Sequence, residues 1–212
     1  MVVDLVVIGA GGFGRETLDV IESINDSCQT YRVVGVVDDH LAPRFLEQLA
    51  LRGYRHLGSV DDWLASGAGD RYVVGIGTPR TRAALVDRIS DSMTACDPLI
   101  HPSAVIGSRF TCGPGSVVCA HAIISTNVRI GDHVHVNPGA VIGHDAQLGD
   151  FVSLNPASVV SGEVAVGPQT LVGANATILQ GLAIGSNVTV GAAACVTRNV
   201  VKEATVKGVP AR

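Results

Sequence analysis

Residues 142–154 read IGHDAQLGDFVSL, in which Ile142, Leu148 and Leu154 stand six positions apart. The same six-residue period runs without a break from Ile100 to Val201, through seventeen units. Ile, Leu or Val fills the first position in sixteen of them, Gly follows in nine, and the fifth position is mostly small, with Ala or Ser in eight. A period of six is too long for a helix and is three times that of a strand. It predicts a coil of three short flat sides, each with one branched apolar residue pointing into a lumen.

Three such units, eighteen residues, make one coil, so residues eighteen apart stack in columns about 4.8 Å apart. Gly and Asn at the corners supply the positive φ that sharp turns need. The pattern resembles the hexapeptide-repeat family, whose fold is a left-handed parallel β-helix. The left hand is implied by that resemblance alone, since crossover rules favour the right hand. Acyltransferases are the usual members of this family, and a purely structural solenoid is the alternative.

The composition of the 212 residues suits one or two domains with a core of Ile and Val, because 47% of the residues are hydrophobic and only 4% aromatic. The net charge of −4 gives no reason to expect nucleic-acid binding. No apolar run has the length of a membrane span. The apolar N-terminus contains Asp4 and no basic stretch, so we interpret it as a first strand and not a signal peptide.

Five cysteines are scattered along the chain without a CxxC pair. Cys112 occupies a lumen position of the repeat, where a thiol packs as a small hydrophobe. We therefore expect all five to be reduced and the protein to be cytoplasmic.

The first hundred residues alternate between strand and helix patterns. We predict strands over 2–9, 32–37 and 72–76, and helices over 15–24 and 81–90. This β-α-β order indicates a small parallel sheet covered by helices. The pattern stops near Cys96-Asp97-Pro98. The predicted fold is thus α/β plus all-β, with a Rossmann-like domain over 1–97, then a left-handed parallel β-helix with a C-terminal tail over 98–212.

A glycine loop, Gly9-Ala10-Gly11-Gly12-Phe13-Gly14, joins the first strand to the first helix, where backbone N–H groups can point at a phosphate. Asp38 and Asp39 end the second strand, where such folds contact a ribose or base, and Gly77 follows the third. A nicotinamide cofactor or the nucleotide of an activated substrate fits this loop, and so does a purely structural turn. Only about 95 residues precede the repeats, roughly half a dinucleotide fold, which favours the nucleotide-linked substrate.

Of seven histidines, we expect most to cap turns or to face solvent. His144 differs because its column reads Ser108, Thr126, His144, Gly162, Gln180, Arg198. One coil beyond the imidazole stands Gly162, whose backbone N–H can face a small ligand. A general base beside a backbone donor is what acyl transfer requires, and a corner histidine without a chemical role is the alternative.

Beyond the repeat itself, the chain resembles the sialic-acid O-acetyltransferase and bacillosamine N-acetyltransferase group of sugar acetyltransferases over nearly its whole length. The most specific segments are Ile142-Gly143-His144-Asp145, Leu148-Gly149-Asp150 and Val160-Ser161-Gly162, with a typical ending over 206–212. The resemblance implies that His144 is the general base, that Asp145 raises its basicity, and that the N–H of Gly162 polarises the thioester carbonyl.

The resemblance also implies the ligands. Acetyl-CoA would lie between two subunits of a homotrimer, near Ser153, Gly173, Ala174, Gly191 and Ala192. The nucleotide of the sugar would lie on the glycine loop and the residues beside it: Gly9, Gly11, Gly12, Phe13, Asp38, Asp39 and Gly77. Asn137 would lie near the acceptor sugar. Some members of the group carry a second histidine at the position of Ser153 and a polar residue at that of Phe13.

The zinc carbonic anhydrases of the γ class use the same kind of helix and bind metal through three histidines, two of them five residues apart. No two histidines here have that spacing, so we expect no metal. The predicted function is acetyl transfer from acetyl-CoA to a nucleotide-linked sugar, for glycan synthesis. The favoured acceptor is the amino group of a UDP- or dTDP-linked amino-deoxy sugar. A sugar hydroxyl is the alternative acceptor, and an NAD-dependent oxidoreductase is the alternative enzyme.

Overall fold

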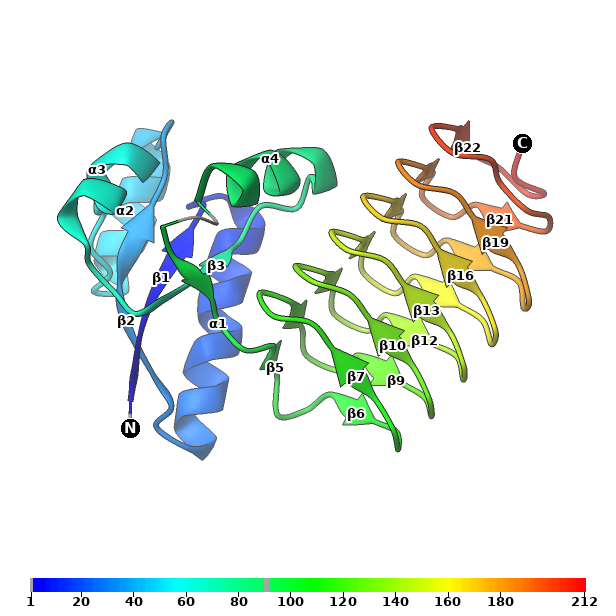
Figure 1. The fold of residues 1–212 in the computed structure, drawn as a ribbon, viewed down its shortest axis with the longest axis horizontal. Coiled ribbons are helices and arrows are strands. Elements are labelled where there is room, and N and C mark those ends of the chain that lie inside the picture. The colour runs from blue at the N-terminus through cyan, green and yellow to red at the C-terminus, as the bar shows by residue number, and fades with distance from the viewer. Residues whose placement is uncertain (1, 90–91) are drawn as a thin grey trace.

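The computed structural model describes residues 2–89 and 92–212, and it has two parts, an α/β part followed by a long parallel β-helix (Figure 1). The first part holds a parallel four-stranded sheet in the order β2-β1-β3-β4. Its strands are β1 (Val3–Ile8), β2 (Tyr31–Val37), β3 (Arg71–Val74) and β4 (Thr94–Ala95). Its helices are α1 (Gly12–Ser27), α2 (Pro43–Leu51), α3 (Val60–Ser66) and α4 (Pro79–Ile89). These elements confirm the predicted fold class for this part of the chain.

Several predicted bounds are wrong, for local reasons. Helix α1 begins three residues before the predicted start, because the glycine loop itself turns into the helix. Strand β3 ends two residues early, since the chain after Val74 turns toward α4. Helix α4 begins at Pro79, whose fixed φ suits a first helical position. The predicted end of that helix, Ser90, lies outside the described residues. Helices α2 and α3 were not predicted, although the Ser59–Asp62 capping box at the start of α3 is visible in the sequence.

The β-helix consists of two-residue strands that repeat every six residues and form three flat faces. The first face holds β5 (Leu99–Ile100), β8 (Val117–Val118), β11 (His135–Val136), β14 (Ser153–Leu154), β17 (Leu171–Val172), β20 (Thr189–Val190) and β22 (Thr205–Val206). The second holds β6 (Val105–Ile106), β9 (Ile123–Ile124), β12 (Val141–Ile142), β15 (Val159–Val160), β18 (Thr177–Ile178) and β21 (Cys195–Val196). The third holds β7 (Thr111–Cys112), β10 (Arg129–Ile130), β13 (Gln147–Leu148), β16 (Ala165–Val166) and β19 (Ala183–Ile184).

Neighbouring strands on each face pair in parallel with a shift of eighteen residues for most pairs, as in Gln147 opposite Ala165. The predicted lumen residues form one apolar core, lined also by the small residues of the fifth position, such as Ala140 and Ala176. Ile106 is the exception, because it lies near the open beginning of the helix with 36% of its surface exposed. Cys112 packs against this core, and burial raises the pKa of its thiol to about 11.

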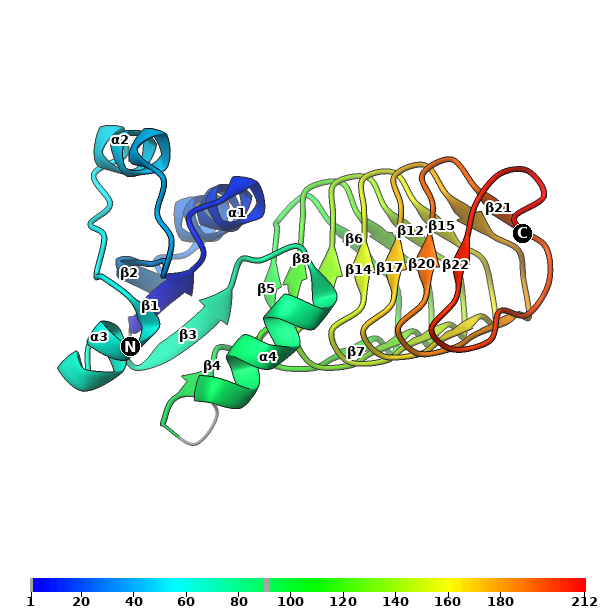
Figure 2. The same cartoon turned by 90° about the horizontal axis from the view of Figure 1, so that it is seen from above.

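The α/β part sits on the first face of the β-helix, and α4 lies alongside that face (Figure 2). Arg82 of α4 is fully buried and donates to backbone carbonyls of two successive coils, those of His133 at 2.8 Å and Phe151 at 2.8 Å. The same guanidinium donates to the Ile76 carbonyl at 2.6 Å and to the Ser153 hydroxyl at 2.9 Å. The Arg82 guanidinium therefore holds the loop that follows β3 against the β-helix.

Two histidines are exceptions to the expectation that most histidines cap turns or face solvent. His133 is 5% exposed and His135 is fully buried at the junction of the two parts. The Nε2 of His135 lies 2.9 Å from the Val74 carbonyl, so it donates, and its ring stacks on Phe13 at 4.1 Å. Burial lowers the pKa of His133 to about 4 and that of His135 well below its usual value, so both rings are neutral. In residues 2–89 and 92–212, no helix is long and apolar enough to cross a membrane.

Candidate active site

His144 stands at the corner between the second and third faces, directly after β12. Its side chain is 57% exposed, and its Nδ1 lies 2.8 Å from Oδ2 of Asp145. The other oxygen of Asp145 accepts a hydrogen bond from the side-chain amide of Asn127 at 3.0 Å. Asn127 precedes Asp145 by eighteen residues, so the column of the repeat places it there. These bonds to His144 and Asn127 hold the pKa of Asp145 below its ordinary value.

The bond to Asp145 sets the tautomer of the ring. An ionised carboxylate only accepts hydrogen bonds, so Nδ1 of His144 must carry the proton. In the neutral ring Nε2 then holds a free electron pair and can act as a base. The pair is thus a base whose orientation is fixed by a neighbouring carboxylate.

Gly162 lies directly over the ring of His144, one coil further along. A Cβ atom at position 162 would stand 2.6 Å from Nε2 and 2.7 Å from Cε1 of His144, closer than atoms pack. Glycine is therefore required for the ring to occupy its place. The N–H of Gly162 has no hydrogen-bond acceptor in the described residues. The same is true of the N–H of Thr126, which occupies the same corner two coils earlier. Because glycine has no side chain, a ligand that lies beside Nε2 of His144 can also reach the N–H of Gly162.

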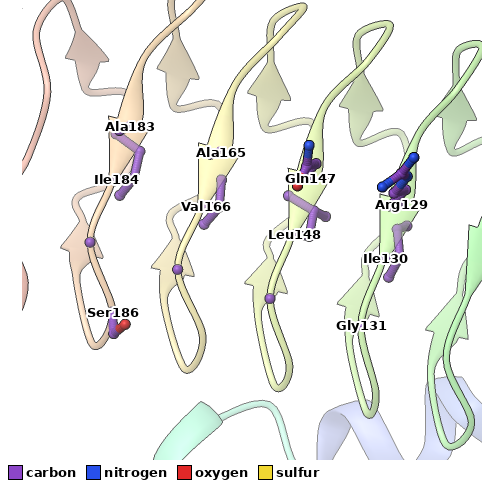
Figure 3. A pocket seen from close by; sticks show the side chains of 13 residues that line it. Arg129, Ile130, Gly131, Gln147, Leu148, Ala165, Val166, Ala183, Ile184 and Ser186 are labelled. Carbon is purple, nitrogen blue, oxygen red and sulfur yellow. The ribbon is translucent and has the colours of Figure 1, made fainter.

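Two shallow grooves lie along the third face. One, of about 670 Å³, contains Arg109, Arg129 and Asp145 among its lining residues. The other, of about 590 Å³, continues toward the C-terminal coils over the small side chains of Ala165 and Ala183. Figure 3 shows the second groove, with Gln147, Ala165 and Ala183 on successive strands of the third face. The first groove therefore reaches the His144 corner through Asp145, whereas the second extends to the opposite edge of the third face, where Gly149 and Gly167 stand.

The glycine loop is built by close backbone packing. Gly9 has a φ of 105°, in the left-handed region, and a Cβ on Gly14 would collide with the carbonyl of Gly9. A Cβ on Gly75 would lie 2.5 Å from the Cα of Gly14. These three glycines serve the fold, whereas Gly11 and Gly12 have open space where a side chain would point. The open space lies at the N-terminus of α1, where backbone N–H groups attract anions.

Asp38 and Asp39 lie at the carboxyl end of β2, as predicted, but their oxygens already have partners. Asp38 accepts from the N–H of Ala10 at 2.8 Å and from the N–H of His40 at 2.9 Å. Asp39 accepts from the N–H of Val60 at 2.8 Å and from Arg88 at 2.9 Å, and these bonds lower its pKa despite partial burial. A pocket of about 260 Å³ lies between these two residues, Gly9 and α4.

The predicted cofactor positions lie on a different edge of the prism. Gly173, Ala174, Gly191 and Ala192 follow strands of the first face, at its corner with the second. Ser153 is fully buried instead, and its hydroxyl donates to the Gly77 carbonyl at 2.9 Å while it accepts from Arg82.

Asn137 lies at the same corner as Gly173-Ala174 and Gly191-Ala192, in the coil that contains His144. It is 7% exposed, and its side-chain amide donates to the Leu154 carbonyl at 2.8 Å.

Within one chain the predicted groups do not all meet. His144, Asp145 and Gly162 come together at one corner. The glycine loop lies against the first face, which is the face opposite that corner in a three-sided prism. The two groups of predicted site residues therefore lie on different sides of the chain.

Sequence reasoning missed two contributors. Asn127, which holds Asp145, could have been found from the eighteen-residue column. Arg82, which joins the two parts, gave no signal, because an arginine on a predicted helix is usually solvated. In the part of the chain that the structure describes, no three His, Cys, Asp or Glu side chains are close enough together to hold a metal ion.

Comparison with known proteins supports the predicted resemblance to sugar acetyltransferases. Residues 4–89 match the family described as the PglD N-terminal domain. A GDP-perosamine N-acetyltransferase of Escherichia coli is 31% identical over 137 residues, which is 62% of this chain and 58% of that relative. The matched segment thus spans less than two thirds of the relative's length.

Two solved structures are similar over nearly their whole length. PerB from Caulobacter crescentus, in complex with CoA and GDP-perosamine, has a TM-score of 0.84, 32% identity and coverage of 99% of this chain and 96% of that one. The acetyltransferase domain of PglB from Neisseria gonorrhoeae, in complex with acetyl coenzyme A, has a TM-score of 0.83, 27% identity and coverage of 100% and 99%.

The parallel β-helix, the Rossmann-like N-terminal domain and the similarity to PerB and PglB define an acyltransferase of the hexapeptide-repeat class. Within that class, the chain belongs to the family of hexapeptide-repeat sugar acetyltransferases.

Proposed function

We propose that the protein transfers an acetyl group from acetyl-CoA to the amino group of a nucleotide-linked amino-deoxy sugar. The observation that carries this proposal is the corner at which Nε2 of His144 lies under the backbone of Gly162 while Asp145 holds Nδ1. The relatives support it, because two of them are described as acting on, or binding, an amino sugar linked to GDP. An amine acceptor is favoured over a hydroxyl for the same reason.

In the proposed reaction, Nε2 of His144 takes a proton from the sugar amine as its nitrogen attacks the thioester carbonyl carbon. The carbonyl oxygen becomes an oxyanion, which the N–H of Gly162 stabilises by donating a hydrogen bond. The C–S bond then breaks, the nitrogen keeps the acetyl group, and the CoA sulfur leaves with the proton that His144 returns. Asp145 stabilises the imidazolium that forms between the two steps.

We further propose that the active protein is a homotrimer. The outward side chains of the second face begin with Val105, 60% exposed, and Ile123, 46% exposed, and continue with the half-buried Val141 and Val159. This apolar stripe fits a face turned toward a three-fold axis. Around such an axis, the His144 corner of one subunit meets the corner of the next that carries Asn137, Ala174 and Ala192.

This arrangement completes the site. The cleft between two subunits is walled by the third face of one and by the first face of the next, on which the nucleotide domain sits. Gly11 and Gly12 of one chain then approach His144 of another. Residues 1–97 and 98–212 act as separate domains in this scheme, one for the nucleotide and one for acetyl transfer.

For the nucleobase there are three candidates. The sequence favours a UDP- or dTDP-linked sugar, whereas the two relatives are described with a sugar linked to GDP. A thiol-release assay with acetyl-CoA and GDP-, UDP- and dTDP-linked amino sugars tests the function, with product analysis to locate the acetyl group. Calorimetric titration with the three nucleoside diphosphates and with NAD(H) separates the proposal from a dehydrogenase. A cytoplasmic location stays a prediction that fractionation would check.

A further inference from the structure

The third-face groove nearest His144 carries two exposed arginines, Arg109 and Arg129. We propose that Arg109 and Arg129 bind the diphosphate of the nucleotide sugar. The inference rests on the proposed function and on its trimer, and it names the part of the substrate that this groove receives.

Both arginines line the groove of about 670 Å³ that reaches Asp145. Their side chains are exposed, and neither makes a hydrogen bond or an ion pair with another side chain in residues 2–89 and 92–212. The one carboxylate in the groove, Asp145, already accepts from His144 and Asn127. The groove therefore carries an excess of positive charge without an internal partner, which suits a ligand with two negative charges.

The spacing of the coils places this charge at a suitable distance from the base. Arg129 lies opposite Gln147, one coil toward the N-terminus, which is about 4.8 Å along the axis. Arg109 precedes Asp145 by thirty-six residues, or two coils. Across a pyranose ring, an amine and a glycosidic phosphate are roughly 5–8 Å apart by ordinary bond lengths. Guanidinium groups one and two coils away can therefore reach the diphosphate while the amine lies at His144.

Coenzyme A has a diphosphate as well, but direction and length place it elsewhere. The proposed cofactor positions, Ala174 and Ala192, lie toward the C-terminus from His144, whereas both arginines lie toward the N-terminus. The pantetheine arm also holds the thioester roughly 15 Å or more from the diphosphate when extended, which is about three coils. The sugar nucleotide is the source that fits.

The trimer brings the second half of the diphosphate site. The third face of one subunit would face the nucleotide domain of the next, and that domain covers the early coils of its own first face. Gly11 and Gly12 at the start of α1 would then contact the same diphosphate from the other side, through backbone N–H groups. Arginines from one subunit and a helix N-terminus from its neighbour would share one anion.

The test uses the full-length protein with Arg109→Gln, Arg129→Gln and the double substitution. Glutamine suits both places, because Gln147 already stands next to Arg129 on its face and Gln169 already has a φ of 57° at a corner like that of Arg109. Arg71→Gln is the matched control. Arg71 is exposed and lies at the amino end of β3, whereas the glycine loop lies at the carboxyl ends of the strands.

Binding is measured first, by calorimetry with GDP, UDP and dTDP and with the matching monophosphates. We expect the wild type to bind its preferred diphosphate more tightly than the monophosphate, and the double variant to lose that difference. Each single variant should weaken diphosphate binding by about tenfold. Kinetics should show the KM of the sugar nucleotide raised similarly, the KM of acetyl-CoA unchanged, and kcat nearly kept.

The outcomes separate this inference from the function on which it rests. An active wild type whose diphosphate affinity survives in the double variant overturns the role of the arginines alone. A raised KM for acetyl-CoA with normal diphosphate binding would assign them to the coenzyme and also overturn it. If the wild type transfers no acetyl group to any amino sugar yet the variants lose diphosphate binding, the proposed function fails and the anion site stands.

Discussion

Replacing Gly162 with Ala adds one methyl group at the most sensitive point of the site. The new Cβ would lie 2.6 Å from Nε2 of His144, whereas non-bonded heavy atoms pack at about 3.5 Å or more. The imidazole must therefore move by roughly 1 Å. A displacement of that size at a reacting atom typically costs about 100-fold in rate. We expect kcat of Gly162→Ala to fall by about 10- to 100-fold.

Stability should change little in the same variant. Gly162 does not have a positive φ, so alanine fits its backbone, and the atom it displaces belongs to a largely exposed side chain. The backbone N–H is retained, and the KM values for both substrates should stay close to those of the wild type. Steady-state kinetics and a thermal melt measure these quantities together.

The double variant with His144→Ala gives the control. With the ring removed, the methyl group has nothing to displace, so Gly162→Ala should lower the residual rate no further. A further large loss in that background would refute the reasoning, because the methyl group would then act on the substrate and not on the base. Unchanged kcat in the single variant would also refute it.

Four other predictions follow from the same structure. His144→Ala should lower kcat by about 10²- to 10⁴-fold with acetyl-CoA affinity kept, and Asp145→Asn should cost less, as single-turnover assays would show. Arg82→Met should destabilise the protein by about 2–4 kcal/mol in urea unfolding, because it leaves buried carbonyls without donors, and Arg82→Lys should cost less. Thermal stability should fall as pH drops from 6.5 to about 4, because unfolding lets His133 take up a proton that burial denies it; His133→Asn should flatten that profile. Gly12→Val should raise the KM of the sugar nucleotide and leave that of acetyl-CoA unchanged, since only the loop gains bulk.

The sequence predicted the β-helix well because the repeat is enforced by packing. Each lumen position must hold a residue of nearly constant size, so the period survives in the residues themselves. The column of stacked residues follows from the period, and it placed Gly162 over His144 before any coordinates were needed. The same rule would have supplied Asn127.

What the sequence did not reveal depends on contacts between distant segments. Nothing local marks Arg82 as a buried cation, since its acceptors on the β-helix, in His133, Phe151 and Ser153, lie fifty or more residues away. His133 and His135 look like surface residues until the N-terminal α/β part covers the first face. The burial of Ser153 has the same cause, and its predicted contact with the cofactor remains a prediction.

Acetyl transfer by His144 to an amino sugar is the central claim, and the most direct measurement is CoA release from acetyl-CoA with GDP-, UDP- and dTDP-linked amino sugars, followed by mass spectrometry of the product. We predict release only when one of these sugars is present, an acetyl group on its amine, and a loss of about 10²-fold or more with His144→Ala. No release with any of the three, or equal release by a folded His144→Ala variant, would contradict it.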